Sequence, residues 1–272
     1  MPEPLNVGIA GFGAIGQAVA AAFAMEDGIP GLRLAAIGAR DAAKVRATLP
    51  PGLPAPPEVV GVTDLAAHAN IVIECAPAAL LPSIAEPVLR AGRTVVVLSC
   101  GALLDAMHLV ELARTHGGRI LVPTGALLGL DAVFAAAQGT IHTVRMITQK
   151  PPKGLLGAPY LVEHGIELGR LTEKFRVFEG TAREAARGFP ANLNVAAALS
   201  LAGVGPDRTR LEIWADPGVT RNIHTIELDS DAARLSMTIE NIPGANPKTG
   251  RITAQSVIAM LRKMRAPLAV GT

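Results

Sequence analysis

The sequence predicts an α/β protein in which a doubly wound parallel sheet is followed by a second, α+β domain with a mainly antiparallel sheet. Up to about residue 125, short apolar runs alternate with helical stretches. This alternation is typical of a parallel sheet that is covered on both faces. From about residue 126 onward, strands follow one another more directly, which indicates an antiparallel sheet with helices beside it. We therefore expect one domain over residues 1–125 and a second over residues 126–250.

The composition is that of a globular protein with a large aliphatic core. Of the 272 residues, 50% are hydrophobic and 3% aromatic, so Ala, Val, Leu and Ile must fill most of the interior. The formal net charge is +2 and the sequence has no Lys/Arg-rich block, so its charge does not indicate a nucleic-acid or membrane partner. No apolar run approaches the ~20 residues of a membrane span, and we expect no signal peptide. We expect a cytoplasmic enzyme or binding protein.

The first strand and helix enclose a glycine motif. An apolar run, Leu5 to Ala10, precedes glycines in the order G-x-G-x-x-G, and a helical stretch from Ala14 to Met25 follows. In this setting the glycines permit a tight turn, close approach of a diphosphate, and close packing of helix on strand, while the helix N-terminus attracts the anion. The motif indicates a Rossmann-type dinucleotide site, although a structural glycine turn remains the alternative. The expected cofactor contacts are Gly11, Gly13, Ala14, Ile15 and Gly16.

The second strand, Leu32 to Gly38, bears on the choice of cofactor. An acidic residue at its end, about 20 residues past the glycines, would hold the ribose 2′-hydroxyl of NAD. Here the strand ends in glycine, and Arg40 follows, which suits the 2′-phosphate of NADP. Asp41 comes one or two positions late and can instead cap the helix from Ala42 to Thr48. NAD and NADP both remain open, as does a solvated Arg40 with no ligand.

The remaining elements of the first domain place small residues at strand ends. Cys75-Ala76-Pro77, Ser99 with its neighbours, and Thr124-Gly125-Ala126 would let a nicotinamide and its ribose approach, because ligands bind at the carboxyl ends of such strands. Tight-turn chemistry is the alternative for any one of these positions. The expected strands are Val59–Val62, Asn70–Glu74, Thr94–Leu98 and Arg119–Val122, and the expected helices are Ala78–Arg90 and Leu103–His116.

The second domain is expected to combine short helices with strands. Thr181 and Glu184 form a capping box that begins one helix. The last helix, Thr253 to Met264, has one apolar face. The expected helices are Leu127–Ala137 and Val195–Ala202; the expected strands are Thr140–Thr148, Lys174–Phe178, Arg208–Ala215, Ile223–Leu228 and Leu235–Glu240; Gln149 to Gly154 is expected to be a basic, Pro-rich loop.

Among six histidines, His224 is the candidate catalyst. It lies where a polar turn enters a strand, and histidine moves protons near neutral pH because its reference pKa is about 6.5. A satisfied structural histidine is the alternative. We expect no metal, since Cys75 and Cys100 stand alone and no Cys/His cluster or H-E-x-x-H occurs. Ser99 lacks the surroundings of a nucleophile.

Cationic side chains could hold a carboxylate-bearing substrate. They are Lys150, Lys153 and Arg221, together with Lys248 in the polar stretch from Asn241 to Thr249. Each could equally be a solvated surface charge.

The chain resembles the L-aspartate dehydrogenase family, NAD(P)-dependent amino-acid dehydrogenases, over essentially its full length. An ordered set of motifs carries the resemblance and is more specific than any one of them. The matching segments are Gly11-x-Gly13-x-x-Gly16, Ser99 to Leu103, Thr124 to Asp131, Lys150-Pro151-Pro152, Phe189 to Ala196, Ala215-Asp216-Pro217, Asn222-Ile223-His224 and Asn246-Pro247-Lys248-Thr249. Gly250 departs from the pattern, where a small hydroxyl residue is expected.

The resemblance implies several residue roles. His224 matches the family's catalytic histidine, and Ala126 and Asn194 match its cofactor contacts, with Asn192 as the fallback for Asn194. From their polar and cationic side chains, we expect Lys150, Asn222, Lys248 and Thr249 to contact the substrate. The resemblance further implies that the C-terminal helix, within residues 251–272, returns to the first domain, and that two chains form a homodimer through the sheet of the second.

The implied reaction is oxidation of L-aspartate to iminosuccinate and its hydrolysis to oxaloacetate and ammonia, or the reverse. Release of iminosuccinate for NAD synthesis is also compatible with the resemblance. Two alternatives are a related two-domain dehydrogenase or reductase of another carboxylated substrate, such as homoserine or dihydrodipicolinate, and a non-catalytic nucleotide-binding sensor. Turnover with a panel of substrates would separate them.

Overall fold

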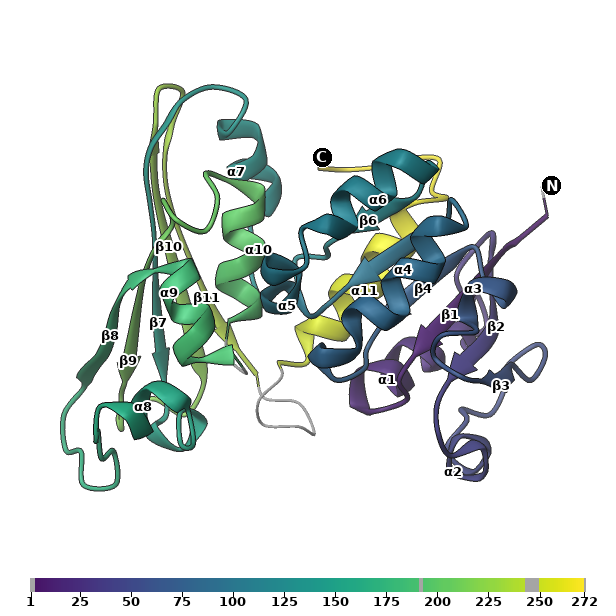
Figure 1. Cartoon of the computed structure of the whole chain (residues 1–272), viewed down its shortest axis with the longest axis horizontal. Helices are drawn as coiled ribbons and strands as arrows, with labels where there is room; N and C mark the ends of the chain where they lie inside the picture. The colour runs from purple at the N-terminus through teal and green to yellow at the C-terminus, as the bar shows by residue number, and fades with distance from the viewer. Residues whose placement is uncertain (1–2, 191–192, 243–249, 272) are drawn as a thin grey trace. The chain divides into compact units, whose positions relative to one another are not determined.

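The chain begins with six short parallel strands that build one sheet. In the computed structural model, which describes residues 3–190, 193–242 and 250–271, these strands run in the order β3-β2-β1-β4-β5-β6 (Figure 1). The order places β1 and β4 side by side at the point where the chain reverses direction across the sheet, which is where such sheets bind ligands. The strands are β1 (Leu5–Ala10), β2 (Leu32–Gly38), β3 (Glu58–Val60), β4 (Ile71–Glu74), β5 (Thr94–Val97) and β6 (Arg119–Leu121). The expected doubly wound parallel sheet is confirmed.

Helices connect these strands. They are α1 (Ala14–Phe23), α2 (Ala42–Ala47), α3 (Leu65–His68), η1 (Ala78–Leu80), α4 (Leu81–Arg90), α5 (Cys100–Asp105) and α6 (His108–His116). The single helix expected over Leu103–His116 is wrong, because α5 ends at Asp105 and α6 begins at His108. The buried Ala106 leaves helical geometry there, and its N–H bonds the carbonyl of Leu103 in a tightened turn. No Gly or Pro marks this break.

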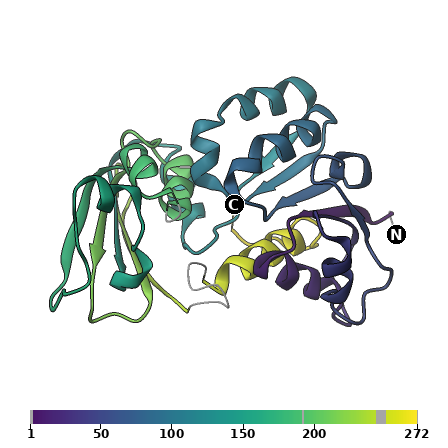
Figure 2. The same cartoon turned by 60° about the horizontal axis from the view of Figure 1, so that its bottom comes forward.

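The C-terminal helix belongs to the same unit as the parallel sheet. Residues 1–123 and 253–270 form one compact unit, and α11 (Ile252–Lys263) lies beside the sheet and α1 (Figures 1 and 2). Val257 and Leu261 of α11 are fully buried in the core that contains Val7, Ile9 and Val19. The apolar face of this helix is therefore part of the core of the first unit.

The second unit, residues 124–252 with 271–272, is built on a five-stranded sheet. The strand order is β11-β10-β7-β9-β8, and every pairing is antiparallel except that of β7 with β9. The expected mainly antiparallel sheet is thus confirmed. The strands are β7 (Ile141–Lys150), β8 (Phe175–Thr181), β9 (Arg210–Ala215), β10 (Asn222–Ser230) and β11 (Arg234–Asn241).

Helices lie on one face of this second sheet. The helices are α7 (Leu130–Ala136), η2 (Pro152–Gly154), α8 (Pro159–Glu163), α9 (Ala182–Gly188) and α10 (Asn194–Ala202). Figure 1 shows α7, α9 and α10 beside the sheet, and the capping box of Thr181 and Glu184 begins α9 as expected. The short helix α8 is not predicted by the sequence pattern.

The register of the sheet separates two faces. Met146, Thr148 and Lys150 of β7 are buried on the helix-covered face, whereas Arg145 and Ile147 between them lie on the other. The expected loop at Gln149 and Lys150 is therefore wrong, since β7 continues to the residue before Pro151. Proline favours extended backbone at the residue before it, which accounts for the longer strand. Lys150 is consequently a buried strand residue.

None of the helices in the part of the chain that the structure describes is long and apolar enough to cross a membrane.

Candidate active site

The glycine loop between β1 and α1 has the geometry that a dinucleotide requires. Gly11 has φ of +92°, and a Cβ there would lie 2.7 Å from the carbonyl oxygen of Cys75. A Cβ on Gly16 would collide with the carbonyl oxygen of Gly11, so both positions need glycine. Around Gly13, in contrast, a Cβ would meet nothing within 4 Å. The backbone at Gly13 thus faces open space, as the approach of a diphosphate demands.

The N-terminus of α1 completes this cradle. Gly13 is the N-cap residue, and no side chain caps the helix, so the N–H groups of Ala14 and Ile15 in the first turn have no side-chain acceptor from the cap. The first turn also contains no acidic residue. Free N–H groups and the positive end of the helix dipole favour a phosphate at this position. The residues present therefore fit the pyrophosphate of a dinucleotide.

The end of β2 presents Arg40 and not Asp41. The carboxylate of Asp41 accepts a hydrogen bond from the N–H of Lys44 at 2.9 Å and so caps α2. This confirms the capping interpretation of Asp41. Arg40 is exposed directly after the strand. A guanidinium at this position suits a 2′-phosphate, whereas no acidic side chain follows β2 before the cap.

The ends of β4 and β5 are held together by Glu74, which sequence reasoning missed. Its Oε2 accepts hydrogen bonds from the N–H groups of Leu98 at 3.2 Å and Ser99 at 2.9 Å, and its Oε1 accepts one from the Ser99 hydroxyl at 3.0 Å. Glu74 is fully buried, and burial raises its pKa to about 7. Glu74 also pairs with Ala10, the residue before the glycine loop. A buried carboxylate thus braces the strand ends beside the cofactor cradle.

This arrangement changes how the neighbouring candidates can act. The hydroxyl and the N–H of Ser99 both donate to Glu74, and its carbonyl accepts from the N–H of Leu103. Cys75 and Ala76 are half-buried and Pro77 is exposed at the end of β4. Burial raises the pKa of the Cys75 thiol far above its usual range, so a thiolate nucleophile is not available there.

In the second unit, His224 lies on the helix-covered face of the sheet. It is in β10, is 2% exposed, and its Nδ1 lies 3.1 Å from the hydroxyl oxygen of Thr148 on the paired strand β7. Burial, and secondarily the charge of Lys150, lower the pKa of His224 to about 3. The imidazole is therefore neutral at physiological pH, with a lone pair on one of its two ring nitrogens. Thr148 holds the ring in place, a role that only the register reveals.

Lys150 lies on the same face, two residues beyond Thr148. It is 5% exposed, and burial lowers the pKa of its ammonium group to about 8. At neutral pH it is still mostly protonated, so it supplies a positive charge inside the sheet's covered face. Lys150 is thus suited to bind a carboxylate.

Two asparagines complete this group of side chains. Asn222 of β10 and Asn241 of β11 are directly opposite one another in the hairpin register. Asn222 is two residues from His224, so both share the covered face. The amide nitrogen of Asn241 donates to the carbonyl oxygen of Ala126 at 2.9 Å. We call Thr148, Lys150, Asn222, His224 and Asn241 the strand-end cluster.

The other expected site residues are placed as follows. Ala126 and Asn194 both belong to the second unit, and Asn194 is the exposed first residue of α10. Lys248 and Thr249 lie outside the described residues, as does Asn192, the fallback for Asn194. Of the substrate contacts expected from sequence, the structure therefore brings Lys150 and Asn222 together with His224.

A parallel sheet with a dinucleotide cradle, joined to a second unit with a buried histidine, defines a two-domain dinucleotide-dependent dehydrogenase. Comparison with known proteins narrows this class. Residues 131–264 match the family model described as aspartate dehydrogenase, C-terminal, and residues 11–123 match that of the homoserine dehydrogenase NAD-binding domain. The chain belongs to the L-aspartate dehydrogenase family.

Individual relatives agree with this assignment. The chain is 60% identical to an L-aspartate dehydrogenase of Bradyrhizobium diazoefficiens, covering 98% of this chain and 94% of the relative. It is also 60% identical to L-aspartate dehydrogenase 3 of Bordetella bronchiseptica, with coverage of 99% and 98%. The crystal structure of aspartate dehydrogenase from Thermotoga maritima superposes with a TM-score of 0.73 at 25% identity, covering 98% of this chain and 99% of that chain.

Proposed function

We propose that this protein catalyses the NAD(P)-dependent oxidative deamination of L-aspartate to oxaloacetate and ammonia, and the reverse reaction. The observation that carries the proposal is the strand-end cluster, in which a neutral buried histidine shares one sheet face with a buried lysine. A dicarboxylic amino acid needs both a proton acceptor and a cation, and the cluster supplies them. The 60% identity to L-aspartate dehydrogenases supports the same reaction.

The first unit supplies the cofactor site in this proposal. Gly11, Gly13 and Gly16 shape the backbone around the pyrophosphate, and the first turn of α1, with Ala14 and Ile15, donates N–H groups to it. The further contacts that we propose are Arg40, Cys75, Ala76, Pro77 and Ser99 of the first unit, and Ala126 and Asn194 of the second. When bound, the nicotinamide accepts a hydride from C2 of the substrate.

His224 acts as the general base. With Nδ1 engaged by Thr148, the ring nitrogen Nε2 accepts the proton that the substrate's amino group loses as the C2–H bond breaks. The product of this step is iminosuccinate. His224 releases this proton to solvent, then takes a proton from water as the water oxygen attacks C2 and returns it to the imine nitrogen. The carbinolamine that forms collapses to oxaloacetate and ammonia as its hydroxyl proton passes to the leaving nitrogen. Lys150, Asn222, Lys248 and Thr249 hold the carboxylates throughout.

The overall balance follows from these steps. One aspartate, one oxidised cofactor and one water give one oxaloacetate, one ammonia, one reduced cofactor and one proton. The hydride leaves with the cofactor and the proton returns to solvent through His224.

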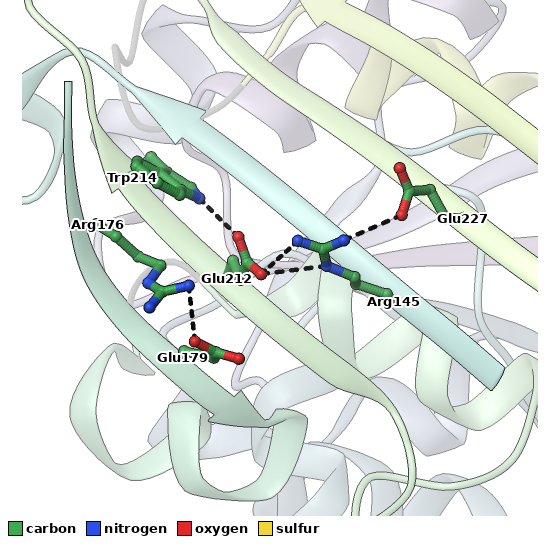
Figure 3. A network of polar contacts seen from close by, with 6 residues as sticks. All are labelled: Arg145, Arg176, Glu179, Glu212, Trp214 and Glu227. Atoms are coloured by element: carbon green, nitrogen blue, oxygen red, sulfur yellow. Dashed lines mark hydrogen bonds and ion pairs between the residues drawn. The ribbon is translucent and has the colours of Figure 1, made fainter.

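We further propose that two chains associate through the uncovered face of the second sheet, and that the enzyme works in the cytoplasm. The face carries a polar network in which Arg145 contacts Glu212 and Glu227, and the indole nitrogen of Trp214 donates to Glu212 at 2.9 Å (Figure 3). Ile147 and Ile223 lie half-buried among these groups. Both cysteines are free thiols, which is usual in a reducing compartment.

Absorbance at 340 nm tests the reaction. Purified protein is incubated with L-aspartate and either NAD or NADP, with parallel wells of homoserine, alanine, glutamate and malate. The proposal predicts reduced cofactor with aspartate alone, and faster reduction of NADP than of NAD if Arg40 binds a 2′-phosphate. No turnover with aspartate, nor with oxaloacetate, ammonia and reduced cofactor, would refute the proposed reaction. Turnover with homoserine would favour the activity named in the family model of the first unit.

A further inference from the structure

One buried polar atom of the strand-end cluster has no partner. Among the residues that the structure describes, Asn241 Oδ1 is the only buried side-chain oxygen or nitrogen without a hydrogen bond. Asn241 is only 3% exposed. Burying an amide oxygen without a donor is unfavourable, so such an atom in a native protein calls for an explanation. A ligand that brings an N–H or O–H group would supply the missing donor.

The orientation of this amide is fixed. Its nitrogen donates to the carbonyl of Ala126 at 2.9 Å, so the oxygen must point the other way. Gly250 packs against it: a Cβ at residue 250 would lie 3.2 Å from Asn241 Oδ1, and 3.3 Å from its Cβ. Glycine at 250, the residue that departs from the family pattern, therefore leaves room beside the amide.

Asn241 is close to the proposed base. It is directly opposite Asn222 in the hairpin, and Ile239, two residues before it, is opposite His224. His224 and Asn241 are therefore diagonal neighbours on one face of the antiparallel pair, and such neighbours are separated by about 7–8 Å. This spacing leaves space for a small ligand to contact both side chains at once. The cluster otherwise offers a lysine ammonium, an amide, a hydroxyl and an imidazole, and it contains no carboxylate.

We propose that Asn241 Oδ1 accepts a hydrogen bond from the amino group of the substrate, or from ammonia in the reverse reaction. This inference rests on the proposed function. An amide oxygen repels carboxylates and attracts N–H donors, so it would place the amino group beside His224 and leave the carboxylates to Lys150. Asn241 is in this view a substrate-binding residue that selects amino acids over dicarboxylates without the amino group.

Two variants and one inhibitor test the proposal. Succinate has both carboxylates of aspartate and no amino group, so its inhibition constant reports carboxylate binding alone. In Asn241→Ala we expect the KM for aspartate and for ammonia to rise about 10–100-fold, the effect of losing a hydrogen bond to a charged group. The succinate inhibition constant and the KM of the cofactor should change by less than about threefold.

Asn241→Asp separates binding from structure. Both variants lose the amide N–H that holds Ala126, but Asp keeps an acceptor oxygen. The preference for aspartate over succinate should therefore fall in Asn241→Ala and stay at or above that of the unmodified protein in Asn241→Asp. A purely structural role would shift both variants in the same direction. Thermal unfolding confirms that each variant is folded. If only one variant folds, its preference for aspartate over succinate still distinguishes substrate binding from a structural role.

Ser200→Ala is the matched control, because Ser200 is buried in the same unit and donates to the backbone carbonyl of Ala197 at 2.8 Å. It should leave the preference unchanged. Equal weakening of aspartate and succinate by Asn241→Ala, or no change in either, overturns the inference while the proposed function stands. Absence of turnover in the unmodified protein overturns the proposed function and the inference with it.

Discussion

His224 is neutral because burial removes the water that would solvate its charged form. Burial lowers its pKa to about 3, so the ring is neutral throughout the pH range in which enzymes work. Replacement by alanine removes the acceptor, and we expect kcat to fall roughly 10²–10⁴-fold, the usual contribution of general acid–base catalysis. Steady-state kinetics measures the loss, and fluorescence titration with reduced cofactor should give unchanged binding. Near-normal turnover would exclude His224 from the mechanism.

Lys150 makes substrate binding depend on pH. Burial lowers its pKa to about 8, so its positive charge is present below that pH and is lost as the pH rises through it. The inhibition constant of succinate should be constant between about pH 6.5 and 7.5 and rise toward tenfold per pH unit above 8. Succinate does not titrate in this range, and His224 with its pKa near 3 does not either.

Lys150→Met should bind succinate at least tenfold more weakly at pH 7, without this pH dependence. The exposed Lys153, which lies three residues along the chain, provides the matched control: Lys153→Met should retain the rise above pH 8. A pH dependence that persists in Lys150→Met would assign it to another group.

The sequence indicates some of these residues and hides others for a physical reason. His224 and Lys150 carry recognisable chemistry, so a polar turn or a proline-rich stretch draws attention to them. Thr148, Asn241 and Glu74 are buried, and each acts through a hydrogen-bond partner that is far from it along the chain. Only the register, which joins residues far apart in the chain, brings these partners together. Asn241 could have been placed opposite Asn222 from the hairpin, had its register been known.

At the scale of elements, the buried carboxyl group of Glu74, which links the ends of β4 and β5, lowers the stability of the protein when it is ionised. The pKa of Glu74 is raised from 4.5 to about 7, chiefly by burial. Between these values the folded state binds more protons than the unfolded state, so this residue makes the protein less stable as the pH rises from about 4.5 to 7. Above pH 7 the buried carboxylate is ionised at the full desolvation cost.

Glu74→Gln should therefore stabilise the protein increasingly with pH. The amide oxygen can accept from the N–H groups of Leu98 and Ser99, and the amide nitrogen can donate to the Ser99 hydroxyl, so the brace persists. The gain in free energy of unfolding should grow from near zero at pH 4.5 to roughly 3 kcal/mol at pH 8. Urea denaturation at pH 5, 6.5 and 8 measures it. A gain that is the same at each pH would refute the raised pKa.

The elements were predicted best where local sequence decides them. Apolar runs located the strands, and the capping box of Thr181 and Glu184 and several glycines located helix ends. The break between α5 and α6 and the continuation of β7 to Lys150 were missed, because tertiary packing of Ala106 and of the strand decides them. The parallel pairing of β7 with β9 inside a mostly antiparallel sheet is likewise a non-local choice.

At the scale of the whole molecule, the second unit's sheet has one face opposite its helices, which we call uncovered, and a single chain leaves this face exposed. Its polar network and its half-buried Ile147, Ile223 and Trp214 fit the chemistry of an interface between two copies of the chain, with apolar side chains among fixed charges. In a two-fold interface the same patch meets itself, so one substitution introduces two like charges near each other.

Thr225→Arg tests this association. Thr225 lies on this face, where its hydroxyl oxygen is 3.0 Å from that of Thr238 on β11. Two facing guanidinium groups would cost several kcal/mol, enough to dissociate a dimer at micromolar concentration. Light scattering should give the mass of two chains for the unmodified protein and of one chain for the variant. Thr115→Arg, an exposed substitution on α6 of the first unit, should keep the mass of two. A monomeric unmodified protein, or a dimer that tolerates Arg at 225, would place the interface elsewhere or remove it.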